Sequence, residues 1–418
     1  MLLHRTPGEL VVVPVVTSVW SSTRTGSTGC WRSRPLYARD RLHHRIEVRG
    51  TRSICYSFRM YINEWYVMAQ SAELTNRPLK VKALGQDFAL FRDSDGHALC
   101  LADVCIHRGG SLSNGKIMGD CLQCPYHGLQ YGGDGICRFV PTLPEGAKIP
   151  ERAKVDAYPV DERYGLIFAF LGDLSEAERT PILEVPEYDQ EGWRTFNLLY
   201  HWHANLEIVV ENSLDATHAE FAHPATSQKG QFRLGDRASI EMLDYERGNA
   251  YVIRSGSLDL TQGHHGISQT FGYMHFDMKT ETGTEPGEFR FYAYTTPVDE
   301  YSVRRYLLLA RNFYFGDEMD KQLLKGVWQF EKEDRTLLED ARPLLAPGPD
   351  TGRLLLAEDQ IIAQYHHYVG ERQKAGWRID TDQVNATRDQ TVYAIPSPAR
   401  RFSKGWITKE IPRLRLSA

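Results

Sequence analysis

Short stretches of alternating apolar and polar residues fill the chain from Trp65 to about residue 173. Residues 88–91 and 98–101 are two such stretches, and the turn-forming run Asp-Ser-Asp-Gly at 93–96 lies between them. Alternation that is interrupted by glycine and aspartate predicts antiparallel β-hairpins. A continuous apolar run near residues 163–172 predicts a buried strand that completes the unit. We therefore expect an all-β domain over residues 60–173.

The pattern changes after residue 173. Residues 174–191 are rich in proline and acidic residues, which is typical of a linker. Beyond it, strand-like stretches occur at 250–258, 271–280, 288–296 and 302–312, and helical periodicity occurs near 206–221, 319–345 and 355–375. His264 and His265 fall in a glycine-rich stretch that we assign to a loop. Residues 192–398 are thus expected to form a second domain of strands and helices, which places the chain in the α+β class.

Composition narrows the classes of protein that the chain could belong to. A chain of 418 residues is long enough for two or three domains with sizeable cores. Its net charge of −5 offers no basic field for nucleic acid. Because no run of eighteen or more apolar residues exists, no membrane-spanning helix is predicted.

A histidine-bearing helix is predicted in the second domain. At 100° per residue, Glu211, Asp215 and His218 share one face of that helix, and an adjacent apolar face carries Leu206, Val210, Leu214 and Phe221. Pro224 disfavours helical geometry at His223, so the helix is expected to end or widen there. Such a break can turn the His223 imidazole towards His218. Two neutral imidazoles and one carboxylate are typical ligands of oxygen-activating ferrous iron.

Asp334 is the candidate for the carboxylate. It lies on the apolar stripe of the helix predicted for 319–345, among Leu323, Val327, Phe330, Leu337, Leu338 and Ala341. The neighbouring Glu331 and Glu333 are predicted to point away from this stripe. A carboxylate on a core-facing stripe is costly unless it is paired or bound to a metal. A buried salt bridge to an arginine is the alternative, and we favour a metal ligand.

A second group of candidate ligands lies in the predicted all-β domain. Cys105 and His107 form a Cys-x-His pair, and Cys124 and His127 form a Cys-x-x-His pair. Mirrored pairs of this kind can bind two irons differently, with thiolates on one and imidazoles on the other. A structural Cys2His2 zinc site is the alternative, but zinc modules usually pair like ligands at each end. A thioredoxin-like pair of Cys121 and Cys124 lacks the expected βαβ context.

Both groups, in this order, resemble the oxygenase (alpha) component of Rieske-type non-haem iron oxygenases. The resemblance runs from about residue 63 to about residue 345. It implies that Cys105, His107, Cys124 and His127 bind a [2Fe–2S] cluster and that His218, His223 and Asp334 bind a mononuclear Fe(2+). It also implies that Asp215 bridges the two centres across subunits and that Asn212 is a polar residue beside the iron, although a helix-surface asparagine is an equal alternative. Leu129 departs from the tryptophan that is frequent in the family.

The same resemblance implies the architecture and the partners. The second domain is expected to be a helix-grip fold, in which a curved antiparallel sheet and flanking helices enclose a pocket. A head-to-tail homotrimer would place the cluster of one subunit beside the iron of its neighbour. No Gly-x-Gly-x-x-Gly fingerprint is present, so electrons from NAD(P)H must come through a separate reductase, with or without a ferredoxin. Free thiols and an iron–sulfur cluster suggest a cytoplasmic setting.

The two ends of the chain are expected to lie outside the fold. Residues 1–59 contain ten arginines, no lysine and only three acidic residues. Because Met60 begins a run that resembles the usual start of the family, we expect this extension to be disordered or absent from the natural protein. An organelle transit peptide is the alternative. Residues 399–418 form a basic tail, which we expect to be solvated.

The predicted function is that of a terminal oxygenase. It would use O2 to hydroxylate, dihydroxylate or oxidatively demethylate an organic substrate. The aromatic residues of the strand predicted near 271–276 suggest that this substrate is aromatic or polycyclic. The alternative is a Rieske-type electron-transfer or ligand-binding protein without oxygenase activity. An electron carrier has no need of Asp215, His218, His223 or Asp334, so these residues separate the two hypotheses.

Overall fold

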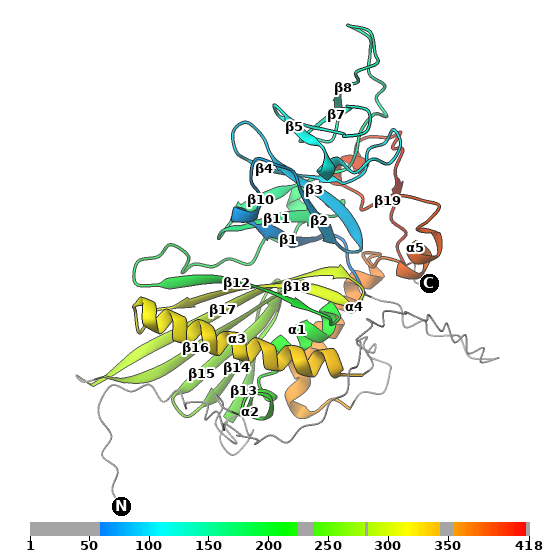
Figure 1. Cartoon of the computed structure of the whole chain (residues 1–418). Coiled ribbons are helices and arrows are strands. Elements are labelled where there is room, and N and C mark those ends of the chain that lie inside the picture. The colour runs from blue at the N-terminus through cyan, green and yellow to red at the C-terminus, as the bar shows by residue number, and fades with distance from the viewer. Residues whose placement is uncertain (1–58, 225–237, 281–282, 343–353, 415–418) are drawn as a thin grey trace, which may run out of the picture. The chain divides into compact units, whose positions relative to one another are not determined.

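The computed structural model describes residues 59–224, 238–280, 283–342 and 354–414 (Figure 1). Apart from Arg59, the predicted extension over residues 1–59 lies outside these ranges. Arg59 itself pairs with the fold, since its Nη1 lies 2.8 Å from Oε2 of the buried Glu207. Within the described ranges no helix is long and apolar enough to cross a membrane.

The first part of the chain forms three small sheets. The sheet β1-β11-β10 comprises Glu64–Gln70, Leu166–Leu171 and Val160–Arg163. The sheet β2-β3-β4-β9 comprises Leu79–Ala83, Gln86–Arg92, Ala98–Ala102 and Ala157–Tyr158. The sheet β5-β6-β7-β8 comprises Lys116–Met118, Cys121–Gln123, Gln130–Gly132 and Cys137–Phe139. The predicted hairpin is β3–β4, an antiparallel pair whose turn contains Gly96 at a φ of 87°, where glycine carries little strain.

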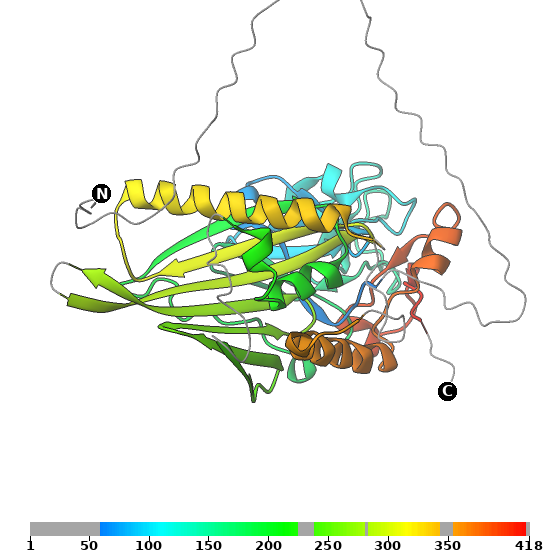
Figure 2. The same ribbon diagram turned by 90° about the horizontal axis from the view of Figure 1, so that it is seen from below.

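The second part is built on one antiparallel sheet in the order β12-β18-β17-β16-β15-β14-β13. In chain order its strands are Arg194–Trp202, Ala238–Leu243, Gly248–Ser255, Leu258–His265, Gln269–Thr280, Gly283–Asp299 and Ser302–Arg311. The helices are α1 (Leu206–Leu214), α2 (Ala219–Ala222), α3 (Asp317–Asp340), α4 (Gln360–Lys374) and α5 (Thr381–Thr387). Figure 2 shows α3 and α4 along the sheet with α1 between them. The predicted α+β class is confirmed.

The period of two along the strands explains how the large sheet is covered. On β18, Leu307 and Leu309 pack with Val327 of α3, whereas Tyr306 and Leu308 pack on the opposite face. That opposite face is covered by residues of β1, β11 and the segment 174–191, among them Val67, Phe168, Ile182, Leu183 and Val185. Around β18 the sheet is therefore buried on both faces. The predicted linker is part of its core.

The carboxyl-terminal segment is not a free tail in the part that the structure describes. Its β20 (Lys409–Glu410) pairs in parallel with β19 (Tyr393–Ala394). Arg400, whose side chain is 6% exposed, donates from Nε and Nη2 to the two Asp156 carboxylate oxygens, at 2.7 Å each. A bidentate, buried pair of this kind fixes geometry strongly. Within residues 399–414, Arg400, Thr408 and Ile411 pack on the fold, whereas residues such as Phe402 and Ile407 are exposed to solvent.

Three strands of the large sheet were not predicted, namely β12, β13 and β15. His264 and His265 lie at the end of β15 and are buried, so their assignment to a loop is wrong. The hydrogen bonds of His264 explain how a polar side chain can be buried at the end of β15. Its Nδ1 is 2.8 Å from the Gly266 carbonyl oxygen and its Nε2 is 2.9 Å from Asn249 Nδ2, so both ring nitrogens are satisfied.

Candidate metal centres

Two matching loops carry the cysteine–histidine pairs. The Cys105 amide donates to the Gly110 carbonyl and the Cys124 amide donates to the Leu129 carbonyl, each at 2.8 Å. The fourth residue after each cysteine is a glycine, Gly109 or Gly128, with φ near 70°. Only glycine adopts this conformation without strain. The repeated cysteine-to-glycine spacing is thus required by the turn itself.

These loops place two thiols inside and two imidazoles outside. Cys105 and Cys124 are buried, His127 is half-buried and His107 is exposed. The two imidazole centroids lie 4.3 Å apart, so both histidines belong to one site. Leu129 is buried in the same core cluster as the two cysteines and shields their side in place of a tryptophan. Two buried thiols opposite two accessible imidazoles suit a cluster with one thiolate-bound and one imidazole-bound iron.

Tyr131 on β7 is an additional contact to the cysteines. Its hydroxyl lies 3.1 Å from Cys105 Sγ. Burial and the Cys105 sulfur raise the pKa of Tyr131 well above its usual range, so the phenol stays protonated and can donate to a thiolate at Cys105. Sequence analysis missed this residue, because only the β-hairpin pairing brings it next to the sulfur.

We expect the variant Tyr131→Phe to keep its [2Fe–2S] cluster but to lower the cluster's reduction potential. The hydroxyl stabilises the more negative, reduced state through its hydrogen bond to sulfur. If the hydrogen bond stabilises the reduced cluster over the oxidised cluster by ~1.4 kcal/mol, its loss lowers the reduction potential by about 59 mV for a one-electron couple. Protein-film voltammetry measures the shift. The matched control Tyr126→Phe removes an exposed phenol from the same loop, and an equal shift there would contradict this role of Tyr131.

The second candidate site begins where α1 ends. The sequence predicted one continuous helix through His218, but α1 stops at Leu214 and α2 starts at Ala219. Asp215 Oδ1 accepts hydrogen bonds from the Thr217 amide and hydroxyl at 2.7 Å each, which competes with helical bonding. The helical face proposed for Glu211, Asp215 and His218 is therefore wrong. Phe221, predicted on the apolar face, is 80% exposed.

The predicted break at Pro224 is present, and it has the predicted effect. His223 ends α2 with a φ of −123° and a ψ of 58°, which is not helical. Its ring centroid lies 5.4 Å from that of His218, and it stacks on Phe330 of α3 at 3.5 Å. The turn after α2 thus brings the second imidazole back beside the first.

Asp334 meets both imidazoles. Its Oδ1 lies 3.3 Å from His218 Nε2 and 3.1 Å from His223 Nε2. These three ligand atoms lie within 4.8 Å of one another, which is close enough for one metal ion to be bound by all three. No arginine within the described residues pairs with Asp334, whose partners are the two imidazoles, so the alternative of a buried Asp334–arginine salt bridge is wrong.

The other nitrogen of each imidazole faces a carboxylate. His223 Nδ1 lies 2.9 Å from Glu333 Oε2, and His218 Nδ1 lies 3.5 Å from Asp215 Oδ2. A carboxylate on Nδ1 holds its proton and directs the lone pair of Nε2 to a metal. Burial lowers the pKa of His218, but hydrogen bonds with Asp215 and Asp334 raise it to about 10. Imidazoles held among carboxylates are an environment that suits a divalent cation, and the donor set fits ferrous iron.

Asn212 also lies at this site, so the alternative of an ordinary helix-surface asparagine is wrong. Its Nδ2 donates to Asp334 Oδ1 at 3.3 Å and lies 3.3 Å from His218 Nε2. Asn212 lies in the last turn of α1, and its side chain reaches α3. The amide therefore connects a histidine and the carboxylate of the candidate triad.

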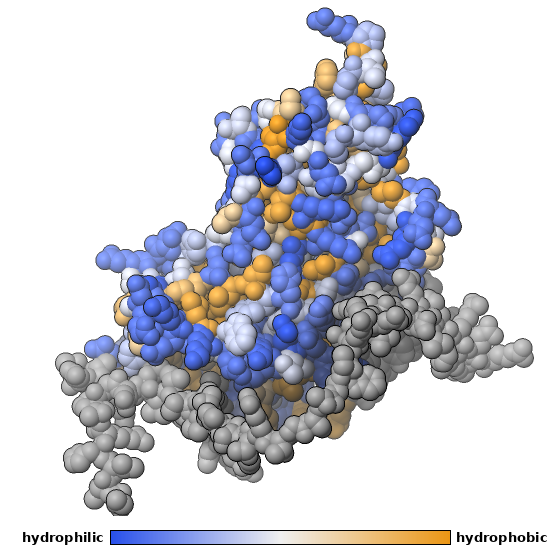
Figure 3. Space-filling view, viewed as in Figure 1, coloured by the Kyte–Doolittle hydropathy of each residue, from blue (hydrophilic) through white to orange (hydrophobic). Residues whose placement is uncertain are grey.

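The helix α3 differs from its predicted face in three places. Glu331, predicted to point elsewhere, is buried and pairs with Arg305, and Glu333 contacts His223. Leu337, predicted in the core, is 52% exposed. Figure 3 shows hydrophobic residues in patches among hydrophilic ones on this side of the molecule. Carboxylates therefore occupy buried positions that the apolar stripe alone did not identify.

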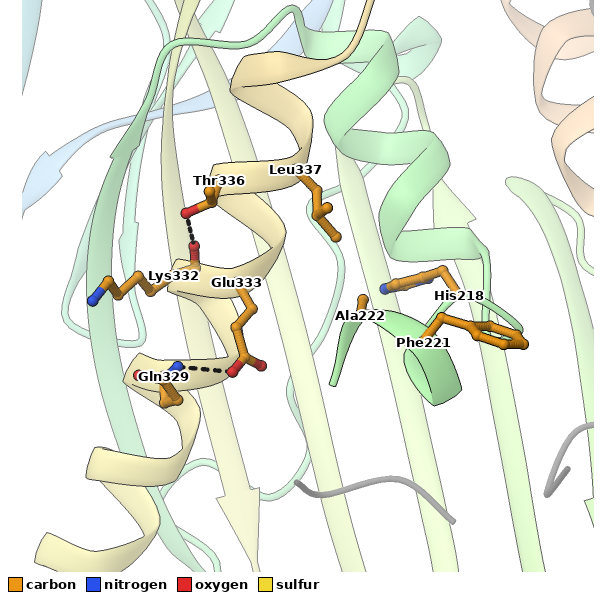
Figure 4. A pocket seen from close by; sticks show the side chains of 8 residues that line it. All are labelled: His218, Phe221, Ala222, Gln329, Lys332, Glu333, Thr336 and Leu337. Carbon is orange, nitrogen blue, oxygen red and sulfur yellow. Dashed lines mark hydrogen bonds between the residues drawn. The ribbon is translucent and has the colours of Figure 1, made fainter. Parts of the chain in front are cut away.

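A cavity of about 690 Å³ opens beside His218. Its lining comes from α2 and α3 and comprises His218, Phe221, Ala222, Gln329, Lys332, Glu333, Thr336 and Leu337 (Figure 4). Gln329 donates to Glu333 across one turn of α3, at 2.7 Å. One of the candidate ligands thus borders a space that is large enough for a small organic molecule.

Comparisons with known proteins agree with both sites. The sequence model of the Rieske [2Fe-2S] domain family matches residues 64–159. The model of the vanillate O-demethylase oxygenase C-terminal domain matches residues 202–375. Each match contains one of the two groups of candidate ligands.

Similar proteins span nearly the same architecture. The oxygenase component of dicamba O-demethylase from Stenotrophomonas maltophilia is 30% identical over 66% of this chain and 86% of its own length. An iron–sulfur subunit of a toluene-4-sulfonate monooxygenase system from Comamonas testosteroni is 28% identical over 72% of this chain and 94% of its own length. A crystal structure of dicamba monooxygenase bound to dicamba has a TM-score of 0.62 at 25% identity, over 79% of this chain and all of that one. The chain belongs to the Rieske non-haem iron oxygenases, as an oxygenase component with a Rieske [2Fe–2S] cluster and a site for mononuclear iron.

Proposed function

We propose that this oxygenase is a monooxygenase of a small aromatic compound that hydroxylates its substrate or removes a methyl group oxidatively. The convergence of His218, His223 and Asp334 beside an open cavity carries this proposal. Support for the reaction class comes from the relatives, whose names describe O-demethylation and monooxygenation of aromatic compounds. In demethylation, one oxygen atom of O2 enters the methyl group. Two electrons and two protons convert the other atom to water.

The ligand roles follow from the geometry. Cys105, His107, Cys124 and His127 would hold the cluster, and His218, His223 and Asp334 would hold the iron. When bound, the two groups supply single electrons and the activation of O2. Asp215 and Glu333 would orient the two imidazoles through their Nδ1 atoms, because a histidine ligand binds well only in one tautomer and orientation. Asn212 would hold Asp334 Oδ1, the oxygen that also faces both imidazoles.

Electrons would come from a separate NAD(P)H-dependent reductase, directly or through a ferredoxin. The relatives are named as a component or subunit of larger systems, which supports this division of labour. We further propose a head-to-tail homotrimer, because the exposed edge of His107 is accessible to a second copy of the chain. The cysteines of the described residues form no disulfide, which favours a reducing compartment such as the cytoplasm.

The proposal is tested on the purified full chain with its cluster and ferrous iron. Iron analysis should give three irons per chain. With a compatible reductase, methoxy- and methyl-substituted aromatic compounds are screened for coupled NADH and O2 consumption, and the product is analysed after reaction with labelled 18O2. Formaldehyde release or one labelled oxygen per product is expected. A cis-diol with two labelled oxygens would overturn monooxygenation, and zinc in place of iron would overturn the site assignment.

A further inference from the structure

A buried ion pair lies beside the proposed iron ligands. On β18, Arg305 donates from Nε to Glu331 Oε2 of α3 at 3.1 Å, and from Nη1 to Ser213 Oγ of α1 at 2.9 Å. All three residues are buried. The guanidinium carbon also lies 5.3 Å from the centroid of the Trp202 ring, which covers it. A single side chain of the sheet therefore binds two of the helices that border the iron site, α1 and α3.

The two helices are held at the level of the proposed ligands. Ser213 follows Asn212, whose amide donates to Asp334 Oδ1. Glu331 precedes Asp334 by three residues, so the two carboxylates lie one turn apart on the buried face of α3. Any change in the spacing between α1 and α3 at this point would move Asp334 relative to Asn212.

The chemistry of the contact between Arg305 and Glu331 indicates that it positions the two helices more than it stabilises the fold. Burying a charged pair costs desolvation energy, and an apolar pair of similar volume is often as stable or more stable. Charge-assisted hydrogen bonds are directional, however, and they fix distances that apolar packing leaves adjustable. Arg305 also supplies the positive charge that lets Glu331 stay close to Asp334, a second carboxylate on the same face.

We propose that Arg305 is a positioning residue for the iron site: through Glu331 and Ser213 it fixes α3 against α1 and so holds the Asp334 carboxylate opposite the two imidazoles. The inference rests on the proposed assignment of His218, His223 and Asp334 as iron ligands. Arg305 touches none of these ligands, and its effect passes through the helices.

The test is the variant Arg305→Met in the full chain with its cluster intact. Ferrous iron is removed with a chelator and titrated back, and binding is followed by the electron paramagnetic resonance of the nitric oxide adduct. We expect iron affinity to fall by about 10–100-fold and the signal to broaden, because Asp334 is no longer held in one place. The visible absorption of the cluster should not change.

Arg311→Met is the matched control. Arg311 on β18 also forms a buried pair with an aspartate of α3, Asp320, at 2.5 Å. Asp320 lies fourteen residues before Asp334, which is about 21 Å along the helix. This variant should lower thermal stability and leave iron affinity unchanged. An equal loss of iron in both variants would overturn the inference, because it would show a general loss of packing.

Two more variants separate positioning from stability. Arg305→Met combined with Glu331→Met replaces the ion pair by apolar residues, and we expect it to restore the melting temperature without restoring iron affinity. Arg305→Lys should restore part of the affinity. Wild-type affinity and signal in Arg305→Met would overturn the inference alone. A wild-type protein that binds no ferrous iron would instead overturn the ligand assignment itself, and the inference with it.

Discussion

Replacing His218 by alanine is expected to abolish substrate oxidation and to leave the visible and paramagnetic spectra of the [2Fe–2S] cluster intact. His218 supplies one of the three proposed ligand atoms of the iron, and its Nε2 lies 3.3 Å from Asp334 Oδ1. Two ligands remain after the substitution, and the buried carboxylate of Asp334 loses one of its two imidazole partners. Removing an iron ligand should therefore empty the site, whereas the cluster lies in another domain.

The measurements are product formation with a reductase and iron content per chain, which should fall from three to two. His201→Ala is the matched control, since His201 is an exposed histidine of β12 in the same domain. It should retain both iron content and turnover. A His218→Ala protein that still oxidises substrate would remove His218 from the site. Loss of the cluster spectrum would show that the two domains do not hold their metals independently.

The cluster loops could be predicted from sequence because their geometry is local. The spacing from Cys105 to Gly109 and from Cys124 to Gly128 encodes a turn that needs positive φ, and the same spacing sets the positions of the two histidines. The family relationship followed from these motifs together with the second group of ligands, and the α+β class followed from the pattern of strands and helices. The alternative of an electron carrier without oxygenase activity is wrong, because the chain belongs to an oxygenase family and carries the second site.

The surroundings of the iron site could not be predicted, because they depend on contacts between distant elements. Helical periodicity assumes that the helix continues, but Asp215 binds the Thr217 amide and ends it. Tyr251 on β14 donates to the Leu214 carbonyl at 2.6 Å and so satisfies the end of α1 from the sheet. Glu331 looked like a solvent-facing residue, because its partner Arg305 is 26 residues away. Pairing of charges across elements leaves no periodic signal in the sequence.

Replacing Asp215 by asparagine is expected to keep both metals and to slow electron transfer to the iron site by about 10–100-fold, the range found when the partner of a metal-bound histidine is removed. Burial alone would raise the pKa of Asp215, but hydrogen bonds from His218 and Thr217 lower it overall, so the carboxylate is ionised. An asparagine oxygen can still accept from Thr217, which preserves the turn. It brings no negative charge to His218 or, in the proposed trimer, to a cluster histidine of the neighbouring subunit.

Single-turnover experiments with a pre-reduced cluster measure this step directly, because cluster oxidation is followed optically without a reductase. Glu211→Gln is the matched control. Glu211 lies one helical turn earlier and pairs with His366 at 3.0 Å, so this variant removes a nearby charge without touching the imidazole ligands. A large effect in Asp215→Asn and a small one in Glu211→Gln would assign the slow step to the His218 contact. Near-normal rates in Asp215→Asn would exclude Asp215 from the path of electrons between the two centres. They would show that electron transfer needs neither the negative charge of this carboxylate nor its contact with His218.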